Sequence, residues 1–175
     1  TGGFIGSYGI LIFEEGRLVD FEVKDVYGAD GQLKGHVEPP ADLKKYLGEA
    51  GWYLRDANWD PDFPSSALKA AWFLEKETGR VVDGVVGLDL FLVQKILRAT
   101  GEIQVLDFQE KITAENFFER AEYYSEINFF PGSTQKQDFL GSVARVLLEK
   151  IGQQDEKTYF NLAKNLYPAL KNKDL

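Results

Sequence analysis

The chain has 175 residues, of which 44% are hydrophobic and 14% aromatic, and this is enough for one domain with a sizeable core. Its formal net charge is -8 at pH 7 without a Lys/Arg cluster, which argues against a nucleic-acid-binding face because such a face needs concentrated positive charge. The absence of cysteine excludes disulfides, thiolate metal sites and cysteine nucleophiles, and the single histidine, His36, excludes a histidine-rich metal site.

No stretch of the sequence approaches the roughly 18 consecutive apolar residues that a membrane-spanning helix needs, and no signal peptide is visible. The chain begins Thr-Gly-Gly-Phe, without an initiator methionine and in the middle of patterned sequence. We therefore expect residues 1–175 to be a single domain excised from a longer protein. Any attachment to a membrane is expected to come from an anchor outside these residues.

Two strands are expected at the start of the chain. Residues 4–13 are rich in β-branched and aromatic side chains, and residues 17–26 alternate between polar and apolar side chains after a Glu-Glu-Gly turn. This alternation is the period of a half-buried strand and predicts a β-hairpin over residues 4–26. Residues 27–31, Tyr-Gly-Ala-Asp-Gly, match neither the P-loop nor the dinucleotide fingerprint and are expected to form an ordinary loop.

The rest of the chain alternates helices with strands. Helices are expected at residues 39–49 (ended by Gly51), 65–79 (capped by Ser65 or Ser66 and ended by Gly79), 90–99 (capped by Asp89 and ended by Gly101), 113–126, 135–151 and 156–170, with a break at 128–133. Apolar runs at residues 81–88 and 103–105 predict strands on either side of one helix, which is the order of a right-handed βαβ crossover. The order predicts an α/β fold, a mixed central sheet with helices on both faces.

The densest chemistry lies in residues 52–64, Trp-Tyr-Leu-Arg-Asp-Ala-Asn-Trp-Asp-Pro-Asp-Phe-Pro. The apolar run from Trp52 to Leu54 is expected to end a strand, and Arg55 and Asp56 follow it directly, ahead of the next helix. Polar groups between a strand's carboxyl end and a helix N-terminus lie where open α/β sheets place ligands. Alternatively, the pair forms a structural ion pair, since such pairs are common outside active sites.

Carboxylates of the same stretch are candidate metal ligands. Asp60 and Asp62 present oxygen atoms of the kind that Mg²⁺ and Ca²⁺ take, and a solvated Asp-Pro-Asp turn is the alternative. Aromatic rings add a second possibility, because Trp52, Trp59 and Trp72 are able to stack on sugar rings. For Trp72, which falls on an apolar helical face, packing in the core is the expected role.

The order of three motifs resembles that of a known family. The motifs are Thr-Gly-Gly-Phe-Ile-Gly-Ser-Tyr-Gly at residues 1–9, Leu-Arg-Asp-Ala-Asn-Trp at 54–59, and Val-Asp-Gly-Val-Val at 82–86, followed by the helix end at 97–101. They look like a bacterial family of envelope-associated domains of unknown function, which in turn resembles the LytR-CpsA-Psr domain. The resemblance implies a LytR-CpsA-Psr-like α/β fold and a location outside the cytoplasmic membrane. Members of that family transfer glycan polymers from polyprenyl-pyrophosphate carriers to the cell wall.

Carried onto this sequence, the resemblance gives Arg55 the role of binding the carrier's pyrophosphate, because a guanidinium suits phosphate oxygens. It gives Asp56 the role of orienting Arg55 or of lying near the metal, and an active enzyme would use Mg²⁺. The further candidate ligand-binding residues are Asn58, Trp59 and Lys136, the last being the cation nearest to a position where the family has an arginine.

The sequence departs from the family's pattern where catalysis needs charge. Residues 2–7 contain no acid in place of the family's Mg²⁺-holding aspartate, and residues 122–124 are Glu-Tyr-Tyr in place of a pair of arginines. Catalytic groups act as a unit, so the loss of one of them lowers activity nearly as much as the loss of all of them. We therefore expect a non-catalytic domain that binds a glycan or a polyprenyl-pyrophosphate-linked ligand. The alternative is a metal-dependent phosphotransferase that uses the Arg-Asp pair with Lys136.

Overall fold

The computed structural model describes residues 4–126, 135–152, 160, 163, 164 and 167, apart from the side chains of residues 136 and 137. The chain divides into two compact units. Unit 1 comprises Thr1–Tyr8 and Lys24–Val86, and unit 2 comprises Gly9–Val23 and Gly87–Leu175.

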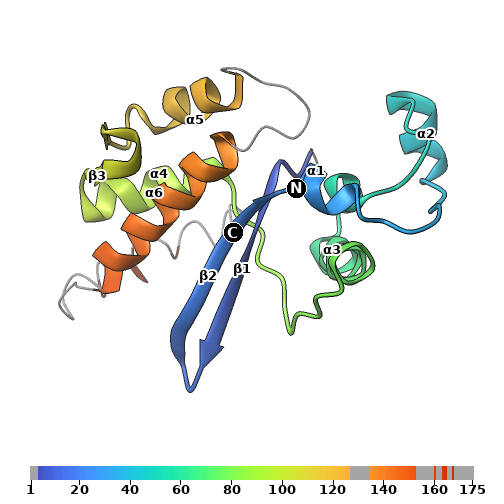
Figure 1. The fold of residues 1–175 in the computed structure, drawn as a ribbon, viewed down its shortest axis with the longest axis horizontal. Helices are drawn as coiled ribbons and strands as arrows, with labels where there is room; N and C mark the ends of the chain where they lie inside the picture. The colour runs from blue at the N-terminus through green and yellow to red at the C-terminus, as the bar shows by residue number, and fades with distance from the viewer. Residues whose placement is uncertain (1–3, 127–134, 153–159, 161–162, 165–166, 168–175) are drawn as a thin grey trace. The chain divides into compact units, whose positions relative to one another are not determined.

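The described residues form a mixed α/β structure with two two-stranded sheets and six α-helices (Figure 1), which confirms the expected α/β class. In chain order the elements are β1 (Ser7–Glu14), β2 (Arg17–Asp25), α1 (Val26–Asp30), α2 (Ala41–Leu47), the 3-10 turn η1 (Leu54–Asp56), α3 (Phe63–Thr78), α4 (Leu90–Thr100), β3 (Ile103–Val105), the 3-10 turn η2 (Leu106–Phe108), β4 (Glu110–Ile112), α5 (Phe117–Glu126) and α6 (Gln135–Gly152). None of the helices in this described part is long and apolar enough to cross a membrane.

Strands β1 and β2 form the hairpin predicted over residues 4–26. Their connection is the two residues Glu15 and Gly16, which both have positive φ, 49° and 78°. Two successive residues of positive φ make the turn whose twist matches that of the flanking strands, so the turn fixes the hairpin locally. The outer part of the hairpin, Gly9–Val23, belongs to unit 2.

The helices of unit 1 differ from the predictions in their bounds and caps. The loop expected at residues 27–31 is wrong, since residues 26–30 form α1. The Asp25 carboxylate accepts a hydrogen bond from the Tyr27 amide at 2.8 Å, and the apolar side of the turn is buried. Helix α2 ends at Gly48, whose φ is 71°, rather than at Gly51. Helix α3 is capped by Asp62 rather than by a serine, and the prediction that Gly79 ends it is confirmed.

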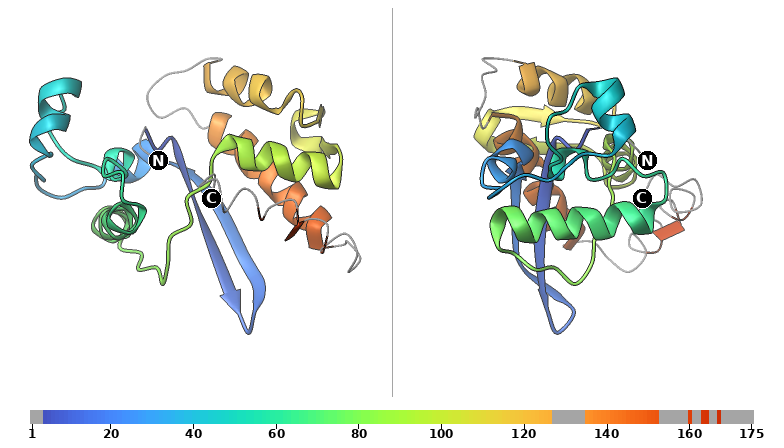
Figure 2. Two further views of the ribbon diagram at one scale, coloured as in Figure 1. Left: turned by 180° about the vertical axis from the view of Figure 1, so that it is seen from behind. Right: turned by 90° about the vertical axis from the view of Figure 1, so that its right-hand side faces the viewer.

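Unit 2 contains α4, α5 and α6, which pack against one another, while α6 also packs on β3 (Figure 2). Helix α4 is capped by Asp89 and ended by Gly101, both as predicted. Helix α5 begins four residues later than the predicted residue 113, because residues 113–116 fold into the turn that precedes it. The buried core residues are Leu97, Ile103, Val105, Ile112, Ala114, Phe117, Ala121, Phe139, Val143 and Leu147.

The strand predicted at residues 81–88 is absent, and the βαβ prediction is therefore wrong for the described residues. Strand β3 pairs with β4 in antiparallel register, Ile103 facing Ile112. In residues 81–88 the side chains of Val81, Val86 and Leu88 are exposed. A short apolar run does not specify a strand without a neighbour to pair with. The break predicted at 128–133 lies outside the described residues, as does most of the helix predicted at 156–170.

Replacing Phe139 with alanine tests where the core of unit 2 lies. The side chain is fully buried and its ring lies 4.5 Å from that of Tyr124 and 5.3 Å from that of Phe108, centroid to centroid. We expect Phe139→Ala to lower the free energy of unfolding by about 3–5 kcal/mol, because it leaves a cavity. Chemical denaturation measures the loss, with the exposed Leu106→Ala as control. Equal effects for the two variants would contradict this core.

Candidate functional site

The Arg-Asp pair lies on a 3-10 turn and not at the end of a strand, so the strand predicted to end at Leu54 is wrong. The backbone closes on itself: the Asp56 amide donates to the Tyr53 carbonyl at 3.1 Å and the Ala57 amide to the Leu54 carbonyl at 3.0 Å. Leu54 is buried and anchors the turn in unit 1. The turn therefore holds the Arg55 backbone in place without support from a sheet.

Arg55 is bound by three carboxylates at once. Its Nη1 lies 3.0 Å from Asp30 Oδ2 and its Nη2 lies 2.7 Å from Glu49 Oε2, and both contacts are hydrogen bonds. Its Nε lies 3.3 Å from Asp56 Oδ2, an ion pair whose alignment falls short of a hydrogen bond. The guanidinium also stacks on the ring of Tyr53, 4.5 Å from its centroid. The side chain is only 17% exposed, so the protein itself uses the surface that a ligand would need.

Negative charge exceeds positive charge in this cluster. Burial raises the pKa of Asp30 although Arg55 acts in the opposite direction, and burial likewise raises the pKa of Asp56. For Arg55 burial favours the neutral form, but the contacts with Glu49 and Asp30 outweigh it and raise the pKa. The guanidinium is thus permanently charged, and its carboxylate partners compete for it.

Glu77 adds a fourth carboxylate from α3. Its side chain is only 3% exposed, and its Oε1 accepts a hydrogen bond from the Leu54 amide at 3.0 Å. Within the described residues its Oε2 has no hydrogen-bond partner. Burial, the largest cause, raises the pKa of Glu77 to about 7. Glu77 therefore changes its charge near neutral pH while it holds the turn that carries Arg55.

Sequence reasoning missed three members of this cluster. Asp30 lies within the segment expected as a loop, residues 27–31, and Glu49 follows α2. For Glu77 a signal exists, because it follows the buried Phe73 and Leu74 at the spacing that places all three on one face of α3. A glutamate on the apolar face of a predicted helix is the mark of a buried carboxylate.

The remaining predicted site residues are placed as follows. Asp62 caps α3, accepting hydrogen bonds from the Ser65 amide at 3.0 Å and the Ser65 hydroxyl at 2.7 Å. Asp60 Oδ1 accepts from the Asp62 amide at 2.8 Å, so both carboxylates are used in the turn. In the part of the chain that the structure describes, no three His, Cys, Asp or Glu side chains are grouped to hold a metal ion. Asn58 is half-buried, and its Oδ1 has no hydrogen-bond partner there.

Lys136 is not brought together with Arg55 by any described contact. It belongs to α6 in unit 2, whereas Arg55 belongs to unit 1, and its side chain lies outside the described residues. Trp59 is exposed, and its amide donates to the Asp56 carbonyl at 3.3 Å. The prediction that Lys136 and Trp59 bind a ligand with Arg55 stays a prediction.

An aromatic surface lies beside the Arg55 cluster in unit 1. The Lys69 ammonium lies 4.8 Å from the ring centroid of Trp52 and 5.1 Å from that of Trp72. Both indoles also pack edge-on against Phe73, and Trp72 remains 37% exposed. Two tryptophans with a cation between them are suited to a sugar that carries negative charge.

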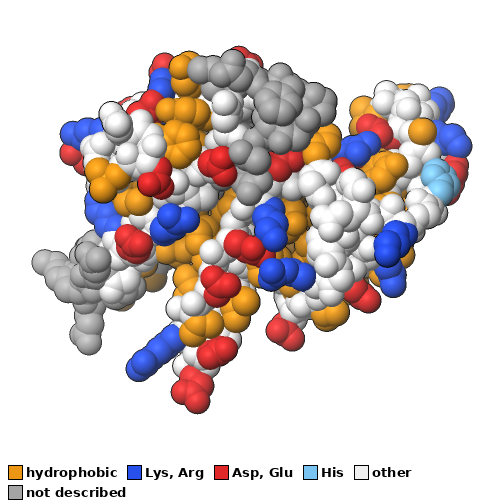
Figure 3. Space-filling model, viewed as in Figure 1, with side chains coloured by type: hydrophobic (Ala, Val, Ile, Leu, Met, Phe, Trp, Pro, Cys, Tyr) orange, Lys and Arg blue, Asp and Glu red, His pale blue; other side chains and the backbone are white. Residues whose placement is uncertain are grey.

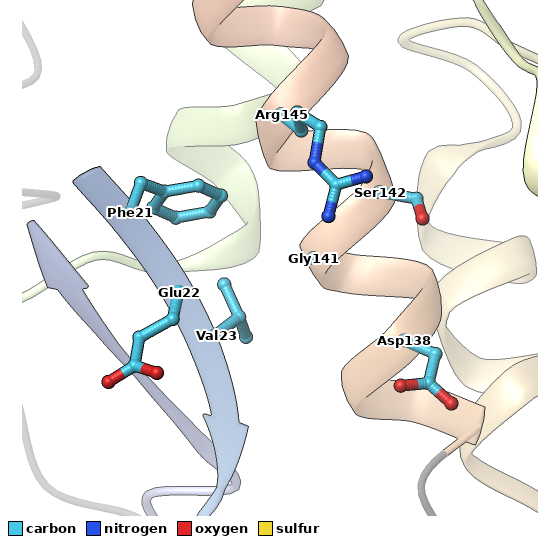
Figure 4. Close-up of a pocket in the computed structure, with 7 residues that line it drawn as sticks. All are labelled: Phe21, Glu22, Val23, Asp138, Gly141, Ser142 and Arg145. Carbon is cyan, nitrogen blue, oxygen red and sulfur yellow. The ribbon is translucent and has the colours of Figure 1, made fainter. Parts of the chain in front are cut away.

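Unit 2 contains a pocket of about 280 Å³ between β2 and α6 (Figure 4). The side chains that line it combine apolar surface with charge of both signs: Phe21, Glu22, Val23, Asp138, Gly141, Ser142 and Arg145. A Cβ added at Gly141 would lie 3.7 Å from Val23 Cβ, an ordinary van der Waals contact, so β2 and α6 are close to touching here. The volume is slightly below the range of about 300–1,000 Å³ typical of small-molecule sites.

Comparison with known families adds one match. The sequence model described as "Protein of unknown function (DUF4012)" matches residues 1–124, which is more than half of the chain. The chain belongs to the DUF4012 family. No curated protein and no solved structure matches it. The match contains the Arg55 cluster and the aromatic surface of this DUF4012 domain.

Replacing Arg55 tests whether the cluster is structural. Arg55→Ala leaves Asp30 and Asp56 buried without their cation, and removing one partner of a buried pair costs about 3–5 kcal/mol. We expect that loss in the free energy of unfolding measured by denaturant, and a smaller one for Arg55→Lys, which keeps the charge but not the fork. Lys45→Ala, on the exposed surface of unit 1, is the control. If Arg55→Ala were as stable as this control, the cluster would not hold the DUF4012 domain together.

The pKa of Glu77 predicts how stability depends on pH. Its folded-state pKa, about 7, lies above its usual 4.5, so the folded protein holds this proton more tightly than the unfolded chain does. The protonated Glu77 therefore stabilises the fold fully below pH 4.5, and this contribution is lost as the pH rises through the folded-state pKa of about 7. The total loss in the free energy of unfolding is about 3 kcal/mol. Glu77→Gln keeps the acceptor for the Leu54 amide but does not titrate.

We therefore expect the free energy of unfolding of the wild type to fall between pH 5 and 8 relative to that of Glu77→Gln, at up to about 1.4 kcal/mol per pH unit. Denaturant titrations at several pH values measure the difference. Glu75→Gln, on the exposed side of α3, should keep the wild-type slope. Parallel curves for the wild type and Glu77→Gln would show that Glu77 does not titrate in this range.

Proposed function

We propose that this DUF4012 chain is a non-catalytic, envelope-associated domain with a LytR-CpsA-Psr-like fold, and that it binds a glycan. The single observation that carries the proposal is the state of Arg55, the residue expected to bind a carrier's pyrophosphate. Its guanidinium is bound to Asp30, Glu49 and Asp56 and is largely shielded from solvent. In this state it acts as the centre of a folded cluster.

Electrostatics supports a structural role for Arg55. A pyrophosphate brought to this guanidinium would also meet the carboxylates that bind it. Unit charges about 4 Å apart interact by about 4 kcal/mol at an effective dielectric constant of 20, so each such contact opposes the single attraction. A phosphoryl-transfer site needs the reverse arrangement, with positive groups in excess where charge develops.

The fold and the location in this proposal rest on the order of the sequence motifs. The run at residues 1–9, the Arg-Asp motif at 54–59 and the Val-Asp-Gly-Val-Val run at 82–86 follow one another as in the LytR-CpsA-Psr domain. The described residues form two two-stranded sheets. A mixed central sheet with helices on both faces is therefore proposed from the order of the motifs alone. Similarity of fold favours a glycan ligand, but the evidence for binding has to come from the residues of the site itself.

The aromatic surface of α3 supports the choice of a glycan. Trp72 is 37% exposed, the ammonium groups of Lys69 and Lys76 lie 5.1 Å and 5.9 Å from its ring centroid, and Lys69 has no carboxylate partner among the described residues. A sugar ring stacks its C–H face on an indole, while an ammonium binds sugar hydroxyls or carboxylates. We infer that wall glycans, and acidic ones above all, bind at this surface.

Titration calorimetry with soluble peptidoglycan fragments and with an acidic wall polysaccharide tests the proposal. We expect Trp72→Ala to weaken glycan binding about tenfold, the effect of truncating an aromatic anchor. Leu68→Ala, exposed on the same helix, and Arg55→Lys should leave the affinity unchanged. Absence of binding to every glycan tested would reject the ligand.

A second assay tests the non-catalytic part of the proposal. The chain is incubated with Mg²⁺, a glycan linked to a polyprenyl-pyrophosphate analogue and a wall acceptor, and the transferred glycan is measured. We expect no transfer. Mg²⁺-dependent transfer that Arg55→Lys abolishes would establish the phosphotransferase instead.

A further inference from the structure

In the part of the chain that the structure describes, the edge of β1 opposite β2 is not paired with another strand. Residues 9–13 of this strand, Gly-Ile-Leu-Ile-Phe, are uncharged, whereas β2 carries Arg17, Asp20, Glu22, Lys24 and Asp25. In β1, Leu11 is 47% exposed and Phe13 is 61% exposed. Figure 3 shows hydrophobic side chains at the surface of the hairpin, with charged side chains beside them.

An exposed apolar edge strand is a template for pairing with another strand. Proteins protect such edges with charged side chains or proline, and residues 9–13 have neither. Among the described residues β1 pairs only with β2, and a two-stranded sheet is marginally stable in water without further packing. The edge of β1 opposite β2 is therefore suited to a third strand.

We propose that this third strand is β1 of a second copy of the chain, paired antiparallel about a two-fold axis to give a continuous four-stranded sheet. A two-fold interface brings the same surface of each copy together. The sequence selects the register centred on Leu11. In it, Leu11 faces Leu11 of the other copy, Gly9 faces Phe13, and Ile10 faces Ile12.

Size and charge both favour this register. The Phe13 ring lies over Gly9, which has no side chain, and a large ring facing a glycine is a favourable cross-strand pair. Every pair within residues 9–13 is uncharged, so no charge is buried. The nearest acids, the two copies of Glu14, each fall opposite Tyr8 at opposite ends of the paired segment, so they do not face each other.

The alternative occupant is a strand of a different protein. A foreign strand would have to be uncharged over the same length and to place a large side chain opposite Gly9. The chain's own β1 meets both conditions at once, which is why a second copy is the partner that the observations favour. Successive residues of β1 present their backbone N–H and C=O groups alternately to β2 and to the outer edge, as such pairing requires.

Single cysteines give a sharp test, because the chain contains none of its own. In the proposed register two Leu11→Cys residues face each other, at a Cβ separation of about 4.5–5.5 Å that a disulfide can close with a small shift. Val19→Cys on β2 is the matched control, since Val19 is 52% exposed on the same hairpin. Under mild oxidation we expect a covalent dimer from Leu11→Cys and monomer from Val19→Cys.

Sedimentation velocity of the unmodified chain provides the independent measurement. We expect a concentration-dependent dimer, its loss in Leu11→Lys, and its retention in Val19→Lys. Gly9→Val, which removes the space for the Phe13 ring while adding a good strand former, should also lose the dimer. Circular dichroism confirms that each variant is folded, and a variant that is not folded is replaced by Ile12→Thr, which keeps strand propensity.

Two results would overturn the proposal. One is a monomer at every concentration of the unmodified chain, which would leave the edge to a different partner. The other is equal cross-linking of Leu11→Cys and Val19→Cys, which would mean non-specific collision of exposed hairpins. Neither result bears on glycan binding, which is measured on α3.

Discussion

The guanidinium of Arg55 connects segments of unit 1 that are far apart in the sequence. Asp30 comes from the end of α1, Glu49 from the connection after α2, and Asp56 from the same turn as Arg55. The Arg55 carbonyl also accepts a hydrogen bond from the Ile5 amide at 2.9 Å, which ties in the segment before β1. A buried charge is tolerated only when it is paired and hydrogen-bonded, so these segments are held in place together.

The same constraint limits what Arg55 is able to do. A guanidinium paired in this way cannot turn to a ligand without leaving buried carboxylates unpaired, and that cost would be subtracted from any binding energy. Glu77 makes the balance sensitive to pH, because its buried carboxylate faces the same cluster and has a pKa of about 7. Protonation of Glu77 removes a negative charge that the single guanidinium does not compensate. The free energy of unfolding therefore depends on whether Glu77 is protonated.

Local patterns predicted local structure well. The hairpin follows from alternation and a two-residue turn, and α4 follows from a capping Asp89 and a terminal Gly101. The failures concern features that depend on distant residues. Residues 81–88 have the composition of a strand but find no neighbour among the described residues, and α1 is too short for periodicity to reveal. The fold class and the β1–β2 hairpin were accessible from the sequence, and the antiparallel pairing of β3 with β4 was not.

The candidate site shows the same division. Arg55 and Asp56 are adjacent in sequence, so the motif could be recognised at once. Asp30 lies 25 residues from Arg55 in sequence and no local pattern links the two. Whether a guanidinium faces solvent or a ring of carboxylates is decided by such tertiary contacts. The contacts of Arg55 with Asp30, Glu49 and Asp56 therefore favour the structural alternative for this motif, and only the tertiary structure supplies them.

One physical rule accounts for both the buried arginine and the bare strand edge. Transferring an uncompensated charge from water is costly, so charge is found inside only where opposite charge meets it. Unit 1 satisfies the rule by bringing carboxylates to Arg55. On the hairpin, residues 9–13 carry no charge. Covering them therefore removes apolar surface from water without burying an unpaired ion. A strand edge that is to remain in water gains nothing from such a sequence, and this is the strongest reason to expect a partner there.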